Sequence, residues 1–151
     1  MPGGDRVVLM VGFRSPLKTQ KLTETTWALL APLVYVSDFA GRTITVPKGF
    51  QTDFASVPRV PIAFWLTGDT AHEAAVVHDY LYQTHGVETR QQADAVFLEA
   101  MAAMGIPAWR RQIMYRAVRL AGGGAWASGP SRFARLQNYG CCDRRLTKRK
   151  K

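Results

Sequence analysis

The sequence predicts an α+β fold, in which a small antiparallel β-sheet from about the first fifty residues packs against about three α-helices. The first fifty residues are rich in β-branched and aromatic side chains, whereas the pattern from residue 70 onward is helical. Capping-box spacings mark two helix starts in that second part. The chain has 151 residues, of which 47% are hydrophobic and 21% charged, so it is long enough for one domain with a real core.

Three segments of the N-terminal part are expected to form strands. The first two, "RVVLMVGF" (6–13) and "TTWALLAPLVYV" (25–36), are apolar and β-branched or aromatic. The third, "RTITVP" (42–47), alternates cleanly and follows the turn-like "SDFAG". The next segment, "GFQTDFASVPR" (49–59), is small and polar without a period of either kind, so we expect a loop there.

Three helices follow, and two of their starts are marked by local sequence. Thr70 with Glu73, and Thr89 with Gln92, have the capping-box spacing. A proline opens the third helix and a glycine triplet ends it. The expected helices are 71–84, 90–104 and 107–121. Only "HGVE" separates the first two, so they should lie antiparallel and in contact.

The net charge of +9 is concentrated at the C-terminus. Residues 132–151 contain eight basic residues and one acidic residue, whereas the rest of the chain is nearly neutral. We therefore expect a single domain over 1–127 and a basic, flexible tail over 128–151. Such a tail could bind nucleic acid or an anionic membrane, or could simply be a solvated terminus.

The cysteines and the N-terminus favour a reducing compartment. Cys141 and Cys142 are adjacent and match neither a disulfide framework nor a zinc-site spacing. The start, "MPGGDRVVLM", lacks the pattern of a signal peptide, and no window reaches the length of a transmembrane segment. A cytoplasmic protein is expected.

The helix "AAVVHDYLYQ" contains a charged pair, His78-Asp79, within an otherwise apolar run. Helical spacing directs His78 along the apolar face and Asp79 to its rim. In the antiparallel second helix, Asp94 should lie opposite His78, with Tyr82 near enough to support it. A carboxylate on one ring nitrogen fixes the histidine tautomer and leaves the other nitrogen as a base.

Other roles for these residues stay open. His78, Asp94 and Tyr82 could form a buried network that only fixes helix packing. Asp53, in the loop before the helices, could face the His78 site as a metal or substrate ligand, or could cap local backbone. The apolar run "VPIAFWL" (60–66) fits a core segment, a lipid-facing surface or a docking patch. Trp109 and Trp126 are assigned to packing, which completes the expected core.

Two resemblances add expectations. The order His78-Asp79-x-x-Tyr82 followed by Asp94-x-x-Phe97 resembles the helix pair of calcium-dependent secreted phospholipases and of parvovirus capsid phospholipases. The resemblance implies that His78 activates water, that Asp94 orients it with support from Tyr82, and that Asp79 binds Ca²⁺. Asp53, as the loop residue named above, would be a further ligand of that ion. The glycine-rich calcium loop of those enzymes has no counterpart here in the usual form.

The second resemblance spans about residues 25–126. "VPKGFQTDFASVPR", "AAVVHDYLY", "ADAVFLEAM" and "YRAVRLAGGGAW", in this order, resemble phage and prophage proteins catalogued as domain of unknown function 1353. This resemblance implies a bacteriophage protein located in the host cytoplasm or incorporated into the virion.

The site residues and the two resemblances together leave two functions as expectations. One is a phospholipase-like or esterase-like hydrolase acting on phospholipid. The other is a non-catalytic tail or baseplate component that binds other phage structural proteins.

Overall fold

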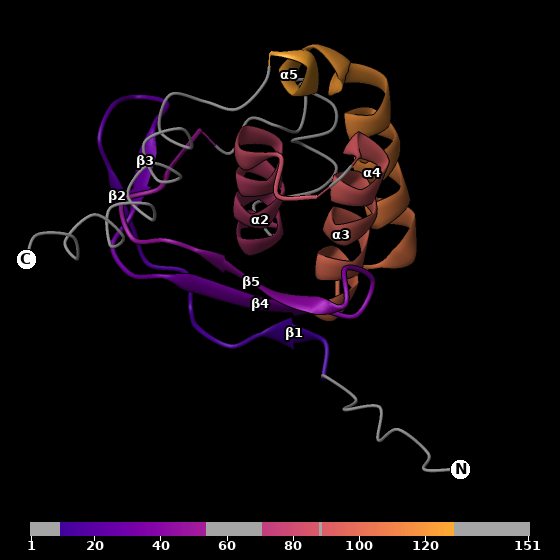
Figure 1. The fold of residues 1–151 in the computed structure, drawn as a ribbon, viewed down its shortest axis with the longest axis horizontal. Helices are drawn as coiled ribbons and strands as arrows, with labels where there is room; N and C mark the ends of the chain where they lie inside the picture. Colours follow the sequence, from indigo (N-terminus) through magenta and orange to yellow (C-terminus); the bar gives the residue numbers. More distant parts are fainter. Residues whose placement is uncertain (1–9, 54–70, 88, 129–151) are drawn as a thin grey trace, which may run out of the picture.

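The computed structural model describes residues 10–53, 71–87 and 89–128, and within them the fold is α+β, as the sequence predicts. Helices α2, α3 and α4 lie side by side, and strands β1, β4 and β5 run across one end of this layer (Figure 1). The apolar run 60–66 and the tail from 129 lie outside the described residues, so their expected roles stay predictions.

The described strands form two antiparallel three-stranded sheets instead of the one sheet expected. Their orders are β1-β4-β5 and β2-β3-β6. The strands are β1 (Gly12–Phe13), β2 (Thr19–Lys21), β3 (Trp27–Leu29), β4 (Leu33–Ser37), β5 (Arg42–Val46) and β6 (Gln51–Thr52). The segment expected as one strand over 25–36 is divided into β3 and β4, because the chain changes sheet between them.

One short strand corrects the expected loop over 49–59. β6 pairs with β3, with Thr52 opposite Trp27. A strand of two residues is too short to show periodicity, so only its tertiary partner makes it recognisable. By contrast, the alternation of β5 is confirmed, because Ile44 and Val46 are buried whereas Thr43 and Thr45 are exposed.

The helices match the predicted ranges closely. They are α2 (His72–Thr84), α3 (Arg90–Ala103), α4 (Ala108–Ala121) and α5 (Gly123–Ala127). The capping box of Thr89 and Gln92 is formed, with both reciprocal hydrogen bonds present. α2 begins one residue later than a box at Thr70 requires, after Ala71, and Thr70 lies outside the described residues. The glycine triplet ends α4 as expected but also opens the short helix α5.

A buried core joins the helices to the sheets. α2 and α3 supply most of its helical side chains, including Val76, Val77 and Leu81 of α2. Glu99 of α3 also links the two layers, because its Oε2 accepts hydrogen bonds from the Tyr35 hydroxyl (2.9 Å) and from Ser37 Oγ (2.6 Å). These contacts hold α3 against the sheet, on a different side of the helix from Asp94, which faces α2.

Within the described ranges, none of the helices combines the length and the apolar character needed to cross a bilayer.

Candidate functional site

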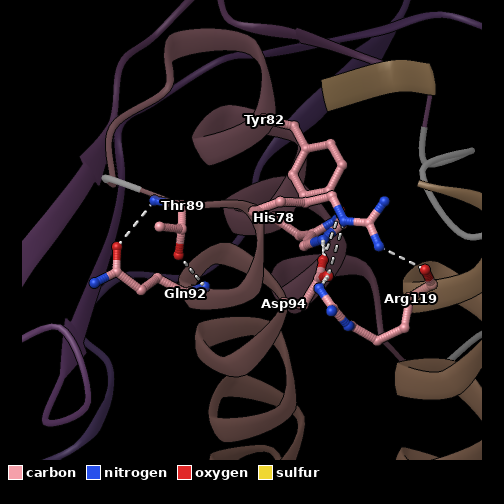
Figure 2. Close-up of polar contacts among 7 residues, drawn as sticks. His78, Tyr82, Thr89, Gln92, Asp94 and Arg119 are labelled. Atoms are coloured by element: carbon pink, nitrogen blue, oxygen red, sulfur yellow. Dashed lines mark hydrogen bonds and ion pairs between the residues drawn. The ribbon is translucent and has the colours of Figure 1, made fainter. Parts of the chain in front are cut away.

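The candidate site lies at the contact between α2 and α3, where His78 and Asp94 face each other (Figure 2). His78 Nε2 lies 2.9 Å from Asp94 Oδ1. The Tyr82 hydroxyl, one turn after His78, donates to the same oxygen at 2.6 Å. This confirms the predicted placement of the three side chains, which follows from two marked helix ends joined by a short connection.

Two arginines complete the surroundings of Asp94. Arg119 Nη1 of α4 donates to Asp94 Oδ2 at 3.0 Å, and Arg90 Nε lies 3.8 Å from the same oxygen. Arg90 Nη2 also donates to the backbone carbonyl of Arg119 at 2.6 Å. Asp94 therefore joins three helices, and its charge is balanced by guanidinium groups without requiring a charged His78.

The pKa values of the pair follow from burial and from these partners. Burial would raise the pKa of Asp94, but hydrogen bonds from His78, Tyr82 and Arg119 outweigh it and hold the pKa below its usual value. Burial lowers the pKa of His78, and the favourable contact with Asp94 does not reverse that shift. His78 is therefore neutral and Asp94 ionised near neutral pH.

The hydrogen bond to Asp94 also sets the tautomer of His78. An ionised carboxylate only accepts hydrogen bonds, so the ring proton is on Nε2 and Nδ1 carries a lone pair. Nδ1 is buried, and none of the residues that the structure describes gives it a hydrogen bond. An unpaired ring nitrogen in a buried position costs free energy unless something binds it. The arrangement is that of an oriented base.

Aromatic rings and a close backbone approach hold this arrangement. The ring centroids of Tyr82 and Phe97 lie 4.2 and 4.8 Å from that of His78. Trp126 packs edge-on against Tyr82, as expected for a packing residue. Gly122 is required here, because a Cβ at that position would lie 2.7 Å from the Tyr82 hydroxyl oxygen.

Asp79 is buried, which corrects its expected position at the rim of the helix. Its exposed fraction is 2%, because Thr52 of β6 covers it and bonds to Oδ2. Within residues 10–53, 71–87 and 89–128, Oδ1 of Asp79 has no hydrogen-bond partner. The pKa of Asp79 is raised to about 8, chiefly by burial. The hydrogen bond from Thr52 lowers this pKa, and the negative charge of Asp53 raises it further.

Asp53 lies on the surface at the end of β6, where its charge acts on Asp79. In the part of the chain that the structure describes, no group of three or more His, Cys, Asp or Glu side chains is arranged to hold a metal ion. Calcium binding by Asp79 and Asp53 therefore stays a prediction.

The raised pKa of Asp79 predicts a distinct pH dependence of stability. The folded state holds a proton on Asp79 up to about pH 8, whereas the unfolded chain releases it near pH 4. Stability should therefore fall as pH rises across this window, by up to ~1.4 kcal/mol per pH unit from this group. Asp79→Asn should remove that dependence.

The measurement is urea unfolding of both proteins with a chelator present, between about pH 5 and pH 8. His78 is present in both proteins, so the difference between them isolates Asp79. A difference that does not change with pH would show that Asp79 is ionised in the folded protein.

Sequence reasoning missed three partners of the site. Arg90 stands four residues before Asp94, a spacing that could have identified it. Arg119 and Thr52 come from distant segments, and both belong to motifs singled out in the sequence without a role. Their approach to the site depends on the packing of α4 and on the pairing of β6.

Comparisons with known proteins give a family and one distant relative. The family model described as "Protein of unknown function (DUF1353)" matches residues 27–118, more than half of the chain. "Uncharacterized protein y4jT" of Sinorhizobium fredii is 34% identical over 82 residues, which cover 51% of this chain and 23% of that protein. The match thus spans less than a quarter of the relative's length. No solved structure matches the chain.

Proposed function

The chain belongs to the DUF1353 family of proteins of unknown function, and from the site geometry we propose that it is a hydrolase that uses His78 to activate water. The observation that carries the proposal is the state of the His78 ring. Nε2 is bonded to Asp94, which Tyr82 and Arg119 hold in place, while the lone pair of Nδ1 has no donor in the described part of the chain. A histidine with only a packing role gains nothing from a buried ring nitrogen that accepts no hydrogen bond, because such a nitrogen costs free energy.

The proposed substrate is an ester, in a phospholipid or a smaller molecule. Nδ1 takes a proton from water as the water oxygen attacks the ester carbonyl carbon. The protonated ring is stabilised by the Asp94 carboxylate and then gives the proton to the departing alkoxide, which leaves as an alcohol. The ester class and a bacteriophage or prophage origin rest on the resemblance of the sequence motifs.

The proposal includes a calcium ion, for which Asp79 would be a ligand. Its Oδ1 is a buried carboxyl oxygen to which no described residue donates a hydrogen bond, and hard cations take carboxylate oxygens as ligands. A calcium ion bound there would polarise the ester carbonyl. No proton transfer described above depends on it.

Calcium is expected to raise the melting temperature of the wild-type protein and to leave that of Asp79→Asn unchanged. An ion at a hundredfold excess over its dissociation constant stabilises the folded state by about 2.7 kcal/mol. Magnesium at the same concentration is the control, because it accepts fewer protein ligands. Equal shifts for both proteins would remove Asp79 from the site, and no shift for either would remove calcium from the proposal.

The proposal is tested by hydrolysis of short-chain esters and of phospholipid by the purified chain, with and without calcium. Saturable turnover is the expected result. If neither substrate is hydrolysed under any of these conditions, the hydrolase function is wrong.

The second candidate is a non-catalytic role as a virion component, in which the same network only fixes the helices. Its supporting observation is burial, since His78 is 1% exposed and Asp94 is fully buried. In that role the protein would bind other phage structural proteins, and its unfolding free energy rather than any turnover would depend on His78.

A further inference from the structure

Helix α4 presents an apolar stripe on the side that faces away from the core. Trp109, Ile113 and Leu120 are 53%, 37% and 88% exposed. At about 100° per residue they fall within about 40° of one another, and buried Val118 lies on the opposite side. This corrects the assignment of Trp109 to the packed interior.

The position of α4 in the fold leaves this stripe uncovered by the described elements. α4 packs against α3 with its Met114 and Val118 side and contacts α5 at its end. It is the outermost of the long helices in the layer (Figure 1). The other large exposed apolar residues lie on other segments and do not extend the stripe: Met10, Val11, Leu22, Leu30 and Phe39.

The same helix is strongly basic. It contains four arginines and no acidic residue. Arg119 is bonded to Asp94, whereas Arg110, Arg111 and Arg116 form no ion pair with a carboxylate among the described residues. Arg116 is exposed and lies beside the apolar stripe, between Ile113 and Leu120. By the same rotation Arg110 lies about 60° from Ile113, at the edge of the stripe, whereas Arg111 lies on the opposite side beside Val118. Arg116 and Arg110 therefore make this face positive, which favours an anionic partner that also accepts apolar side chains.

We propose that the outer face of α4 docks onto the surface of an anionic lipid bilayer, with Trp109, Ile113 and Leu120 inserted and Arg110 and Arg116 on the headgroups. Interfacial helices combine these residue types in this way. The basic C-terminal tail and a second copy of the chain are poor occupants, because both are positively charged. A stable protein interface uses about 20–30 residues a side, which is more than a stripe about 16 Å long provides. A bilayer surface can accept such a stripe without a complementary surface around it.

This inference rests in part on the proposed function, because the hydrolase activity is what favours a lipid surface over an acidic protein as the partner of α4. A hydrolase that reaches an ester in a bilayer must first bind that bilayer. Binding itself needs no catalysis, so His78→Gln should bind vesicles as the wild type does.

The test is co-sedimentation of the full chain with vesicles of phosphatidylcholine, alone or mixed equally with phosphatidylglycerol. The wild type should bind the anionic vesicles, and salt should weaken that binding. Leu120→Gln should reduce the affinity about tenfold through lost apolar burial. Arg116→Gln should reduce it about fivefold, for the anionic vesicles alone.

The matched control is Leu22→Gln, which replaces a 49% exposed leucine outside α4 and should bind as the wild type does. All variants keep the basic tail, so its contribution is constant. Trp109→Phe should also lose part of the tryptophan emission shift caused by vesicles.

Two results would overturn the inference. One is the absence of vesicle binding by the wild type, and the other is equal binding by the wild type and Leu120→Gln. Capture by polyglutamate that Leu120→Gln abolishes, without vesicle binding, would assign the face to an acidic protein instead. Hydrolysis of short-chain esters without vesicle binding overturns this inference alone, whereas vesicle binding without hydrolysis overturns only the proposed function.

Discussion

Replacing His78 with glutamine is expected to reduce ester hydrolysis by a factor of ~10² to 10⁴, the usual contribution of a positioned base. The glutamine amide nitrogen can occupy the place of Nε2 and donate to Asp94, so the structural hydrogen bond is kept. What the variant lacks is the acceptor nitrogen at Nδ1. The measurement is the rate of short-chain ester hydrolysis, together with urea unfolding of each protein.

His78→Asn is the matched control for this substitution. Its shorter amide matches the position of Nδ1 and cannot reach Asp94, so it should lose both hydrolysis and about 1–3 kcal/mol of stability. Comparison of the two variants thus separates the catalytic effect of the acceptor nitrogen Nδ1 from the stabilising effect of the hydrogen bond to Asp94. Glutamine with near-wild-type turnover would show that Nδ1 takes no proton, and the non-catalytic role of the network would then be favoured.

Replacing Asp94 with alanine is expected to lower the free energy of unfolding by about 3–5 kcal/mol, the range for breaking a buried ion pair from one side. The carboxylate is fully buried and accepts hydrogen bonds from His78, Tyr82 and Arg119. After its removal, the buried ring N–H and the phenol O–H have no acceptor. The guanidinium of Arg119 is partly exposed and can turn to water, so it contributes less to the loss.

Urea unfolding at neutral pH measures this loss, and Glu24→Ala provides the surface control. Glu24 forms an ion pair with Lys21, but its side chain is 97% exposed, so little change is expected. Tyr82→Phe combined with Asp94→Ala completes a double-mutant cycle. The tyrosine hydroxyl should contribute to stability when Asp94 is present and much less when it is absent. Strictly additive losses would contradict the network.

The helices and the pair at the site were determined by the sequence itself. Local signals define their ends, such as the Thr89–Gln92 capping box, and a connection of five residues (85–89) forces α2 against α3. With both helices fixed, the 3.6-residue repeat is sufficient to place His78 opposite Asp94, with Tyr82 one turn further along. These relations are short-range in sequence, so patterns within about thirty residues contain them.

Only the tertiary structure decided the remaining features, because they depend on contacts between distant segments. Pairing of β6 with β3 brings Thr52 onto Asp79 and buries a carboxyl group that the helical repeat alone placed at a rim. Packing of α4 on α3 brings Arg119 to Asp94 and turns Trp109 outward. A helical repeat defines which side chains share a face, but the neighbour that covers the face is chosen by the fold.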